Sequence, residues 1–254
     1  MNKYEQNLIF WQLLLYGVHI GHRFRNSSLY AGWLVFTYTY KTLIINLYKT
    51  ILGFRNGYVG FDYCTRAGSP IWFLNLNKAY DIYTNESALR CGEFAYSTYW
   101  IHGMISNWLF LADQINQLWH YTEDAHKGQF KKLEMDYSPW FLSRWSWPRS
   151  VLISSVHTSE WPSHECLVSR TPSLGIVDTN VSGDDTNIAT PGNDDSLESM
   201  VYYNTSTSLY ILEKKYMHIT GWLHHIRENK RNITFSEWIL RHFIKNNGFW
   251  VYGL

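Results

Sequence analysis

Five aspartates in the second half of the chain are the residues best suited to chemistry. Asp178 directly follows a short apolar run, and the others lie downstream in segments rich in Gly, Ser and Asn: Asp184, Asp185, Asp194 and Asp195. Carboxylates gathered at a strand end are ligands that a hard cation such as Mg²⁺ prefers. One interpretation is therefore a magnesium-dependent phosphotransferase or hydrolase. Against it, the chain has no GxxxxGKS/T, GxGxxG or nucleophile-elbow motif.

The same residues also have a structural explanation. The apolar run at 174–177 stops abruptly at polar residues, which is typical of a buried parallel strand at its carboxyl end. Pro191-Gly192 indicates a turn, and residues 193–196 supply N-cap candidates for a helix expected over 197–212. Acidic side chains are favourable at a helix N-terminus. We therefore expect a structural loop and cap formed by Asp178, Asn180, Asn193, Asp194 and Asp195.

A second group of residues is suited to contact with a polyanion. The segment from residue 19 to 25 contains His19, His22, Arg23 and Arg25 between glycines and serines. Glycines let the backbone approach phosphates, and arginines pair with them. The segment predicts an RNA-facing loop, and a plain polar turn is the alternative. The H-x-x-H spacing alone does not indicate a metal site.

These residues must be held by an alternation of strands and helices. Hydrophobic patterning predicts strands at 71–76, 96–101, 151–156 and 174–177 and helices at 7–16, 77–90 and 197–212. Residues 33–38 and 42–47 suggest a hairpin, or an edge strand followed by the first core strand. A helix is expected to start at 49, and a helical region over 159–169 to be interrupted by Pro162. The alternation predicts a three-layer α/β/α sandwich with a mostly parallel sheet.

Composition narrows the class of protein. The chain has 254 residues, a net charge of +1 and 18% aromatic residues, including 13 Trp. The near-neutral charge argues against a long basic arm, so any RNA contact must come from local clusters of Arg and Lys. The three cysteines are isolated and predict ordinary core residues. The longest apolar stretch, at 29–48, is too polar for a membrane span.

Four short motifs, in order along the chain, resemble one known family. They are GVHIGH at 17–22, IINLYKT at 44–50, RCG at 90–92 with GMISNW at 103–108, and VDTN with PGNDDS between 177 and 196. Together they are similar to the bacterial and organellar form of small-subunit ribosomal protein S2. The resemblance spans about residues 10 to 212.

The resemblance implies a flavodoxin-like sheet and a structural role in the small ribosomal subunit, with no catalytic residue, cofactor or metal. The implied partners are small-subunit rRNA and neighbouring ribosomal proteins, with no homo-oligomer. Phosphate contacts that position the protein are expected from the loop at 19–25 and from Lys41, Lys49, Arg55, His102 and Asn107. The chain departs from the family at Tyr48, Tyr99, His102 and Ser154, which puts individual contacts there in doubt.

The resemblance also divides the chain. Residues 1–106 and 149–216 are expected to form the two parts of the α/β domain. Residues 107–148 replace the family's long helical hairpin in reduced form, because prolines interrupt the return arm. Residues 217–254 are a basic and aromatic extension, expected as two short amphipathic helices or a partner site. Protein interfaces are expected at Trp140, Trp145, Trp147, Trp222 and Trp238.

Localisation follows from composition and from the form of the motifs. The chain shows no secretory signal and no Arg-rich transit peptide at its start. Together with the aromatic-rich composition, this predicts a protein of a mitochondrial ribosome, with a plastid as second choice. A further alternative is an interaction module like the laminin-binding precursors of the cytosolic branch of the family, which the bacterial-style motifs disfavour.

Overall fold

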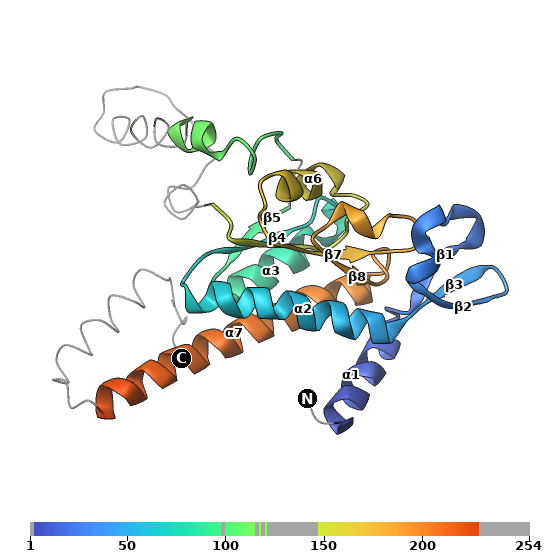
Figure 1. The fold of residues 1–254 in the computed structure, drawn as a ribbon, viewed down its shortest axis with the longest axis horizontal. Helices are drawn as coiled ribbons and strands as arrows, with labels where there is room; N and C mark the ends of the chain where they lie inside the picture. The colour runs from blue at the N-terminus through green and yellow to red at the C-terminus, as the bar shows by residue number, and fades with distance from the viewer. Residues whose placement is uncertain (1–2, 98–99, 115–116, 118–119, 121–146, 229–254) are drawn as a thin grey trace.

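The computed structural model of the chain describes residues 3–97, 100–114, 117, 120 and 147–228. A five-stranded sheet lies between two helical layers (Figure 1). Its strands are β4 (Ile71–Leu74), β5 (Phe94–Tyr96), β6 (Ser150–Ile153), β7 (Ser173–Val177) and β8 (Ile188–Pro191). All pair in parallel in the order β5-β4-β6-β7-β8. If these five strands are numbered 1 to 5 along the chain, their order in the sheet is 2-1-3-4-5. This order confirms the expected sandwich and its flavodoxin-like arrangement.

The helices divide between the two faces of the sheet. One face is covered by α2 (Leu47–Arg66), α3 (Asp81–Cys91) and α7 (Leu197–Glu228), and the other by α6 (Glu160–Val168) (Figure 1). Strands β4, β6 and β7 are buried at every position, which explains why their sequences are apolar runs without alternation. Helix α1 (Lys3–Leu15) packs against α2 and ends before Gly17, whose φ is +67°.

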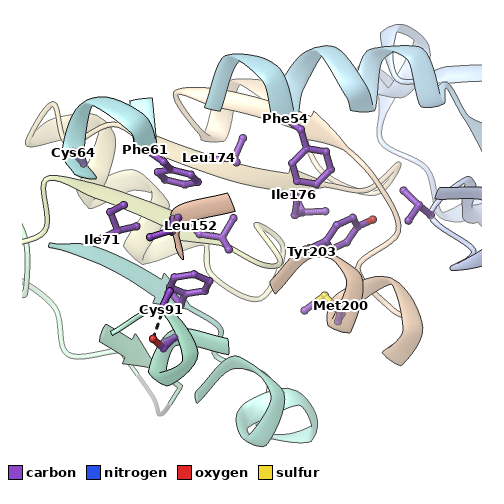
Figure 2. Close-up of a cluster of buried hydrophobic side chains, with 14 of the residues drawn as sticks. Phe54, Phe61, Cys64, Ile71, Cys91, Leu152, Leu174, Ile176, Met200 and Tyr203 are labelled. Atoms are coloured by element: carbon purple, nitrogen blue, oxygen red, sulfur yellow. Dashed lines mark hydrogen bonds between the residues drawn. The ribbon is translucent and has the colours of Figure 1, made fainter. Parts of the chain in front are cut away.

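Each face of the sheet has its own hydrophobic cluster. Figure 2 shows the cluster on the face covered by α2 and α7, which includes Phe61, Leu152, Ile176 and Tyr203. The opposite cluster is built around Trp72 and includes residues from β6, α6 and the segment at 100–108. The three cysteines are free and buried, as the sequence predicted. Both faces are therefore closed by apolar packing, and polar groups collect at the strand ends.

A separate antiparallel sheet lies at the end of the molecule near α1 (Figure 1). Its strands are β1 (Ile20–Arg23), β2 (Val35–Thr39) and β3 (Thr42–Ile45), in the order β1-β3-β2, with short 3-10 turns η1 (Phe24–Asn26) and η2 (Leu29–Trp33) between β1 and β2. The expected hairpin is confirmed. The alternative, that residues 42–47 form the first core strand, is wrong, because β3 pairs with β1 and β2 instead of the parallel sheet. Residues 20–23, which were expected in a loop, form strand β1.

Three further boundaries differ from the expectations. Pro191, expected in a turn, is the last residue of β8. Because β8 is an edge strand with no neighbour on its outer side, a residue without an N–H is tolerated there. Pro162 lies in the first turn of α6, where a missing N–H costs little, so the helix is continuous. The strand expected from residue 96 is instead Phe94–Tyr96. The downstream segment from Trp100 is held by side-chain hydrogen bonds to Glu165, described below.

The remaining elements complete the path of the chain. A short 3-10 turn η3 (Lys78–Tyr80) precedes α3, which ends at Gly92 with φ +68° as the sequence indicated, and η4 (Gly183–Asp185) lies between β7 and β8. Residues 108–114 are helical. The reduced hairpin expected up to 148 falls mostly outside the described residues. Helix α7 continues past residue 216 to Glu228, so the first part of the expected extension prolongs this helix.

Candidate functional site

The acidic residues identified in the sequence meet at the carboxyl edge of β7 and β8. Asp178 directly follows β7 and is 1% exposed, and residues 192–196 connect β8 to α7. The N-terminal segment is fastened to this corner by Asn193, whose Nδ2 donates to the Gly17 carbonyl (3.1 Å) and whose N–H donates to the Val18 carbonyl (3.2 Å). Residues far apart in the chain thus form one corner, as the strand-end rule predicts.

His22 lies between two of the aspartates. Its Nδ1 is 3.1 Å from Asp178 Oδ2, and its Nε2 is 3.0 Å from Asp195 Oδ2. Its backbone N–H donates to Thr179 Oγ1 (2.9 Å). Interaction with Asp178, reinforced by the charges of Asp195 and Asp194, outweighs burial and raises the pKa of His22 to about 9. The imidazole is therefore cationic at neutral pH and joins β1 to the carboxyl edge of the sheet.

Asp194 points into the same corner but has a different environment. It is buried and accepts a 2.6 Å hydrogen bond from Ser155 Oγ. Burial, followed by the nearby charge of Asp178, raises the pKa of Asp194 to about 7. Asp194 is thus a buried hydrogen-bonded group, whereas Asp195 is exposed.

The N-terminus of α7 is capped by Asn193 and Ser196, the residues on either side of Asp194 and Asp195. Asn193 Oδ1 accepts from the N–H groups of Asp195 (2.9 Å) and Ser196 (3.3 Å), and Ser196 Oγ accepts from the Ser199 N–H (3.3 Å). These bonds satisfy donors at the start of α7. Asn180 lies in the partly buried turn after Asp178. The geometry therefore combines an Asn turn, a serine cap and a buried carboxylate within six residues.

Three groups in the corner have the geometry of possible metal ligands. One ligand atom from each of His22, Asp178 and Asp195 lies within 4.8 Å of the others. An imidazole nitrogen with two carboxylate oxygens could take a divalent cation. Asp184 and Asp185 do not belong to this group: they lie in η4, where the Asp185 carbonyl accepts a hydrogen bond from Ser163. The five-carboxylate magnesium set considered from the sequence is not assembled in this part of the chain.

The basic residues expected to face RNA are placed in two different ways. Arg23, Arg25, Lys41 and Arg55 are exposed. By contrast, Lys49 Nζ donates to the Trp33 carbonyl and lies 5.9 Å from the centre of the Trp33 ring. His19 is partly buried, and burial lowers its pKa. The structure thus separates exposed surface cations from Lys49 and His19, whose side chains are partly buried.

His102 and Asn107 are presented by a segment that Glu165 organises. Both residues are exposed, and the His102 ring packs edge-on against Trp161 at 4.6 Å between ring centroids. The Glu165 carboxylate accepts four hydrogen bonds of 2.7–3.2 Å, from the indole of Trp100 and the backbone N–H groups of residues 103, 105 and 106. Burial opposes ionisation, but these four bonds outweigh it and lower the pKa of Glu165.

The sequence pattern alone does not predict this role of Glu165. The available signal was a single acid inside the otherwise uncharged stretch from Trp161 to Ser169, because a buried charge needs partners. Those partners lie 59 to 65 residues upstream, and no local pattern identifies them.

The tryptophans expected at protein interfaces are only partly described. Trp147 is 37% exposed, contacts Trp108 at 6.2 Å between ring centroids, and donates from Nε1 to Thr171 Oγ1 (3.4 Å). Trp222 falls on α7 beyond the residues whose side chains are described. Trp140, Trp145 and Trp238 lie outside the described residues. Within the described part of the chain, no helix has the length and hydropathy of a membrane span.

Comparison with known proteins agrees with the motifs. The model of the family described as ribosomal protein S2 matches residues 13–209. The chain is 26% identical over 223 residues to small ribosomal subunit protein uS2 of Wigglesworthia glossinidia brevipalpis, covering 82% of this chain and 93% of the relative. It is 29% identical over 207 residues to the protein of the same name from Blochmanniella floridana, covering 76% and 89% of the two chains.

Proposed function

Because the chain belongs to the ribosomal protein S2 family, we propose that it is a structural constituent of the small ribosomal subunit, held there by rRNA and neighbouring ribosomal proteins. The observation that carries this proposal is the family match over residues 13–209, which includes the whole parallel sheet and the His22–Asp178–Asp195 corner. A single copy per subunit is part of the proposal.

The exposed cations are the proposed rRNA contacts. Arg23, Arg25, Lys41 and Arg55 are exposed and would be accessible to phosphates, and His102 and Asn107 are exposed on the segment that Glu165 anchors. Such contacts would position the protein on RNA and would not read bases. His22 and Lys49 would stabilise this surface without contacting RNA, since their charged atoms contact Asp178 and the Trp33 carbonyl within the protein.

The tryptophan-rich stretch and the C-terminal extension are the proposed protein contacts. Trp147 already packs on Trp108 within the chain, which leaves Trp140, Trp145, Trp222 and Trp238 as the candidates for neighbouring proteins. Aromatic side chains supply much of the binding energy of protein interfaces.

We also propose that the chain is not an enzyme. The two carboxylates nearest to a possible cation, Asp178 and Asp195, are paired with His22, and Asp194 is bonded to Ser155. These contacts account for the acidic residues as supports of the corner. The bacterial form of the motifs and the aromatic-rich composition favour an organellar ribosome, with a mitochondrion proposed first and a plastid second.

Sedimentation tests the proposal directly. The chain, carrying an affinity label at its C-terminus, should migrate with small-subunit particles in a sucrose gradient of an organelle lysate, and should leave them as the salt concentration rises. The double change Arg23→Gln and Arg25→Gln should shift its release to lower salt. Arg170→Gln, an exposed arginine at the opposite, amino-terminal edge of the sheet, is the matched control. A chain that never enters these particles, in any organelle fraction, would overturn the proposal.

A further inference from the structure

We propose that the tip of the β2–β3 hairpin binds unpaired RNA nucleotides by stacking aromatic side chains on their bases. This inference rests on the proposed function and adds a class of RNA and a set of residues to it. The aromatic tip is defined by three exposed rings and three exposed cations beside them: Phe24, Tyr38, Tyr40, Arg23, Arg25 and Lys41.

The rings of the aromatic tip contribute little to the protein core. Tyr38 is 74% exposed and Tyr40 is fully exposed, and Phe24 is 72% exposed. The buried positions of this small sheet are Leu43 and Ile45 on β3. Among the described residues, no ring contact involves any of the three aromatic side chains. Two large rings exposed on a short hairpin, with Phe24 exposed on the adjacent turn η1, indicate a binding surface.

The backbone at the tip gives a second, independent observation. Tyr40 has a φ of +53°, a conformation that Gly and Asn adopt readily and that costs a bulky side chain about 1 kcal/mol or more. The two-residue turn between Thr39 and Thr42 would be better served by a small residue. A tyrosine in this position, with its ring in solvent, is the kind of local conflict that marks a functional site.

Hydrogen bonding across the strands places positive charge beside the rings. The Phe24 N–H donates to the Lys41 carbonyl (3.1 Å), and Arg23 is the register partner of Thr42. Lys41 is therefore the second residue of the turn that begins with Tyr40, Arg23 lies opposite the end of that turn, and Arg25 follows Phe24 in η1. Aromatic faces next to arginine and lysine are the two components of surfaces that bind single-stranded nucleic acid.

The charge of the surrounding chain selects a polyanion as the partner. Between Gln6 and Phe61 there is no aspartate or glutamate, whereas the same stretch contains Arg23, Arg25, Lys41, Lys49 and Arg55. The whole chain is nearly balanced, with 22 basic and 21 acidic residues, so this segment is a local exception. A local cationic field of this kind attracts phosphate.

The aromatic rings favour unpaired nucleotides over a duplex. In an A-form helix the base faces are stacked on one another, and a duplex offers a protein mainly phosphates and 2′-hydroxyls. Rings on a hairpin tip can stack only on bases that are splayed out of the helix, as in loops and bulges. Stacking tolerates any base, so we expect little sequence preference at this site.

The test compares single-stranded and fully paired RNA. Binding of the purified full chain to a fluorescent single-stranded RNA of mixed sequence and to a duplex of equal length is measured across a salt series. Tyr38→Leu and Tyr40→Asn should each weaken single-strand binding by about fivefold or more and leave duplex binding unchanged. Tyr38→Phe should retain the affinity. Tyr63→Leu on α2, 75% exposed like Tyr38, is the matched control and should have no effect.

The design separates this inference from the proposed function. Tyr40→Asn should keep or raise the thermal midpoint while lowering RNA affinity, so a loss of binding cannot be assigned to misfolding. If Lys41→Gln weakens both RNAs and the ring variants weaken neither, rRNA binding stands and base stacking is overturned. The stacking inference is also overturned if the ring variants bind RNA normally and instead release a ribosomal protein from the particle. Loss of particle association by the unaltered chain would overturn the proposed function itself.

Discussion

The Glu165 carboxylate accepts the indole N–H of Trp100 at 2.9 Å, joining α6 to a segment 65 residues earlier in the chain. The same carboxylate accepts three backbone N–H groups within residues 103–106. One buried charge therefore fixes the conformation of the segment that presents His102 and Asn107. Its two oxygens are fully occupied, which explains how a carboxylate is accommodated among apolar residues.

Glu165→Gln should lower the free energy of unfolding by about 2 to 4 kcal/mol. An amide supplies one acceptor oxygen and directs an NH₂ group at N–H donors, so at least one buried donor loses its partner. Urea unfolding monitored by tryptophan fluorescence measures the change. Glu86→Gln, which alters an exposed glutamate paired with Arg90 on α3, is the control and should cost less than about 0.5 kcal/mol. Equal midpoints for the two variants would contradict the role assigned to Glu165.

His22 should make stability depend on pH in the neutral to alkaline range. Its folded-state pKa of about 9 lies above the ordinary value of 6.5, so the stabilisation is fully present below pH 6.5 and is lost as pH rises through 9. His22→Gln should therefore lower the free energy of unfolding by about 2 to 3 kcal/mol at pH 6 and by much less at pH 9.5. Urea midpoints at the two pH values give the result. His164→Gln, at an exposed site on α6, should change the midpoint little at either pH; a loss from His22→Gln that does not vary with pH would contradict the ion-pair assignment.

The ionised Asp194 carboxylate should destabilise the folded protein, so neutralising it should have the opposite effect to removing the charge of His22. Its folded-state pKa is raised to about 7, so the folded protein binds a proton more tightly than the unfolded chain, and ionisation above pH 7 is destabilising. Asp194→Asn keeps an oxygen that accepts from Ser155 and removes the buried charge. It should raise the free energy of unfolding by about 1 to 3 kcal/mol at pH 8, with a smaller gain at pH 5. Asp184→Asn, at an exposed site in η4, is the control; destabilisation by Asp194→Asn at pH 8 would show that the charge is needed for folding.

The sequence predicted the parts of this structure that depend on local order. The apolar run ending at Asp178, the caps near Ser196 and the αL stop at Gly92 follow from the residue types alone. The pairing of His22 with Asp178 could not be predicted in this way, because it depends on how the chain folds over a long distance. His22 and Thr179, which are joined by a hydrogen bond at this edge of the sheet, are 157 residues apart in the sequence. For the same reason β3 was open to two interpretations. Its apolar pattern suits either sheet, and its partner β1 was hidden in a segment that reads as a loop.

Two glycines on α2 should respond in opposite directions to the same substitution. At Gly53 an added Cβ would lie 2.6 Å from Thr190 Oγ1 and 3.0 Å from Thr190 Cα on β8, so α2 would have to move away from the sheet edge. At Gly60 an added Cβ would meet nothing within 4 Å. Gly53→Ala should therefore lower the free energy of unfolding by about 1 to 3 kcal/mol, since a close backbone contact cannot relax cheaply.

Gly60→Ala is the internal control for this close approach. It should raise the free energy of unfolding by about 0.5 to 1 kcal/mol, because alanine loses less conformational entropy in a helix than glycine does. Both variants change one hydrogen to a methyl group on the same helix, so helix propensity contributes equally to each. Thermal and urea unfolding of the two proteins, side by side, measures the difference. If Gly53→Ala stabilised the protein as much as Gly60→Ala, α2 would not rest on β8 as closely as the contact between Gly53 and Thr190 requires.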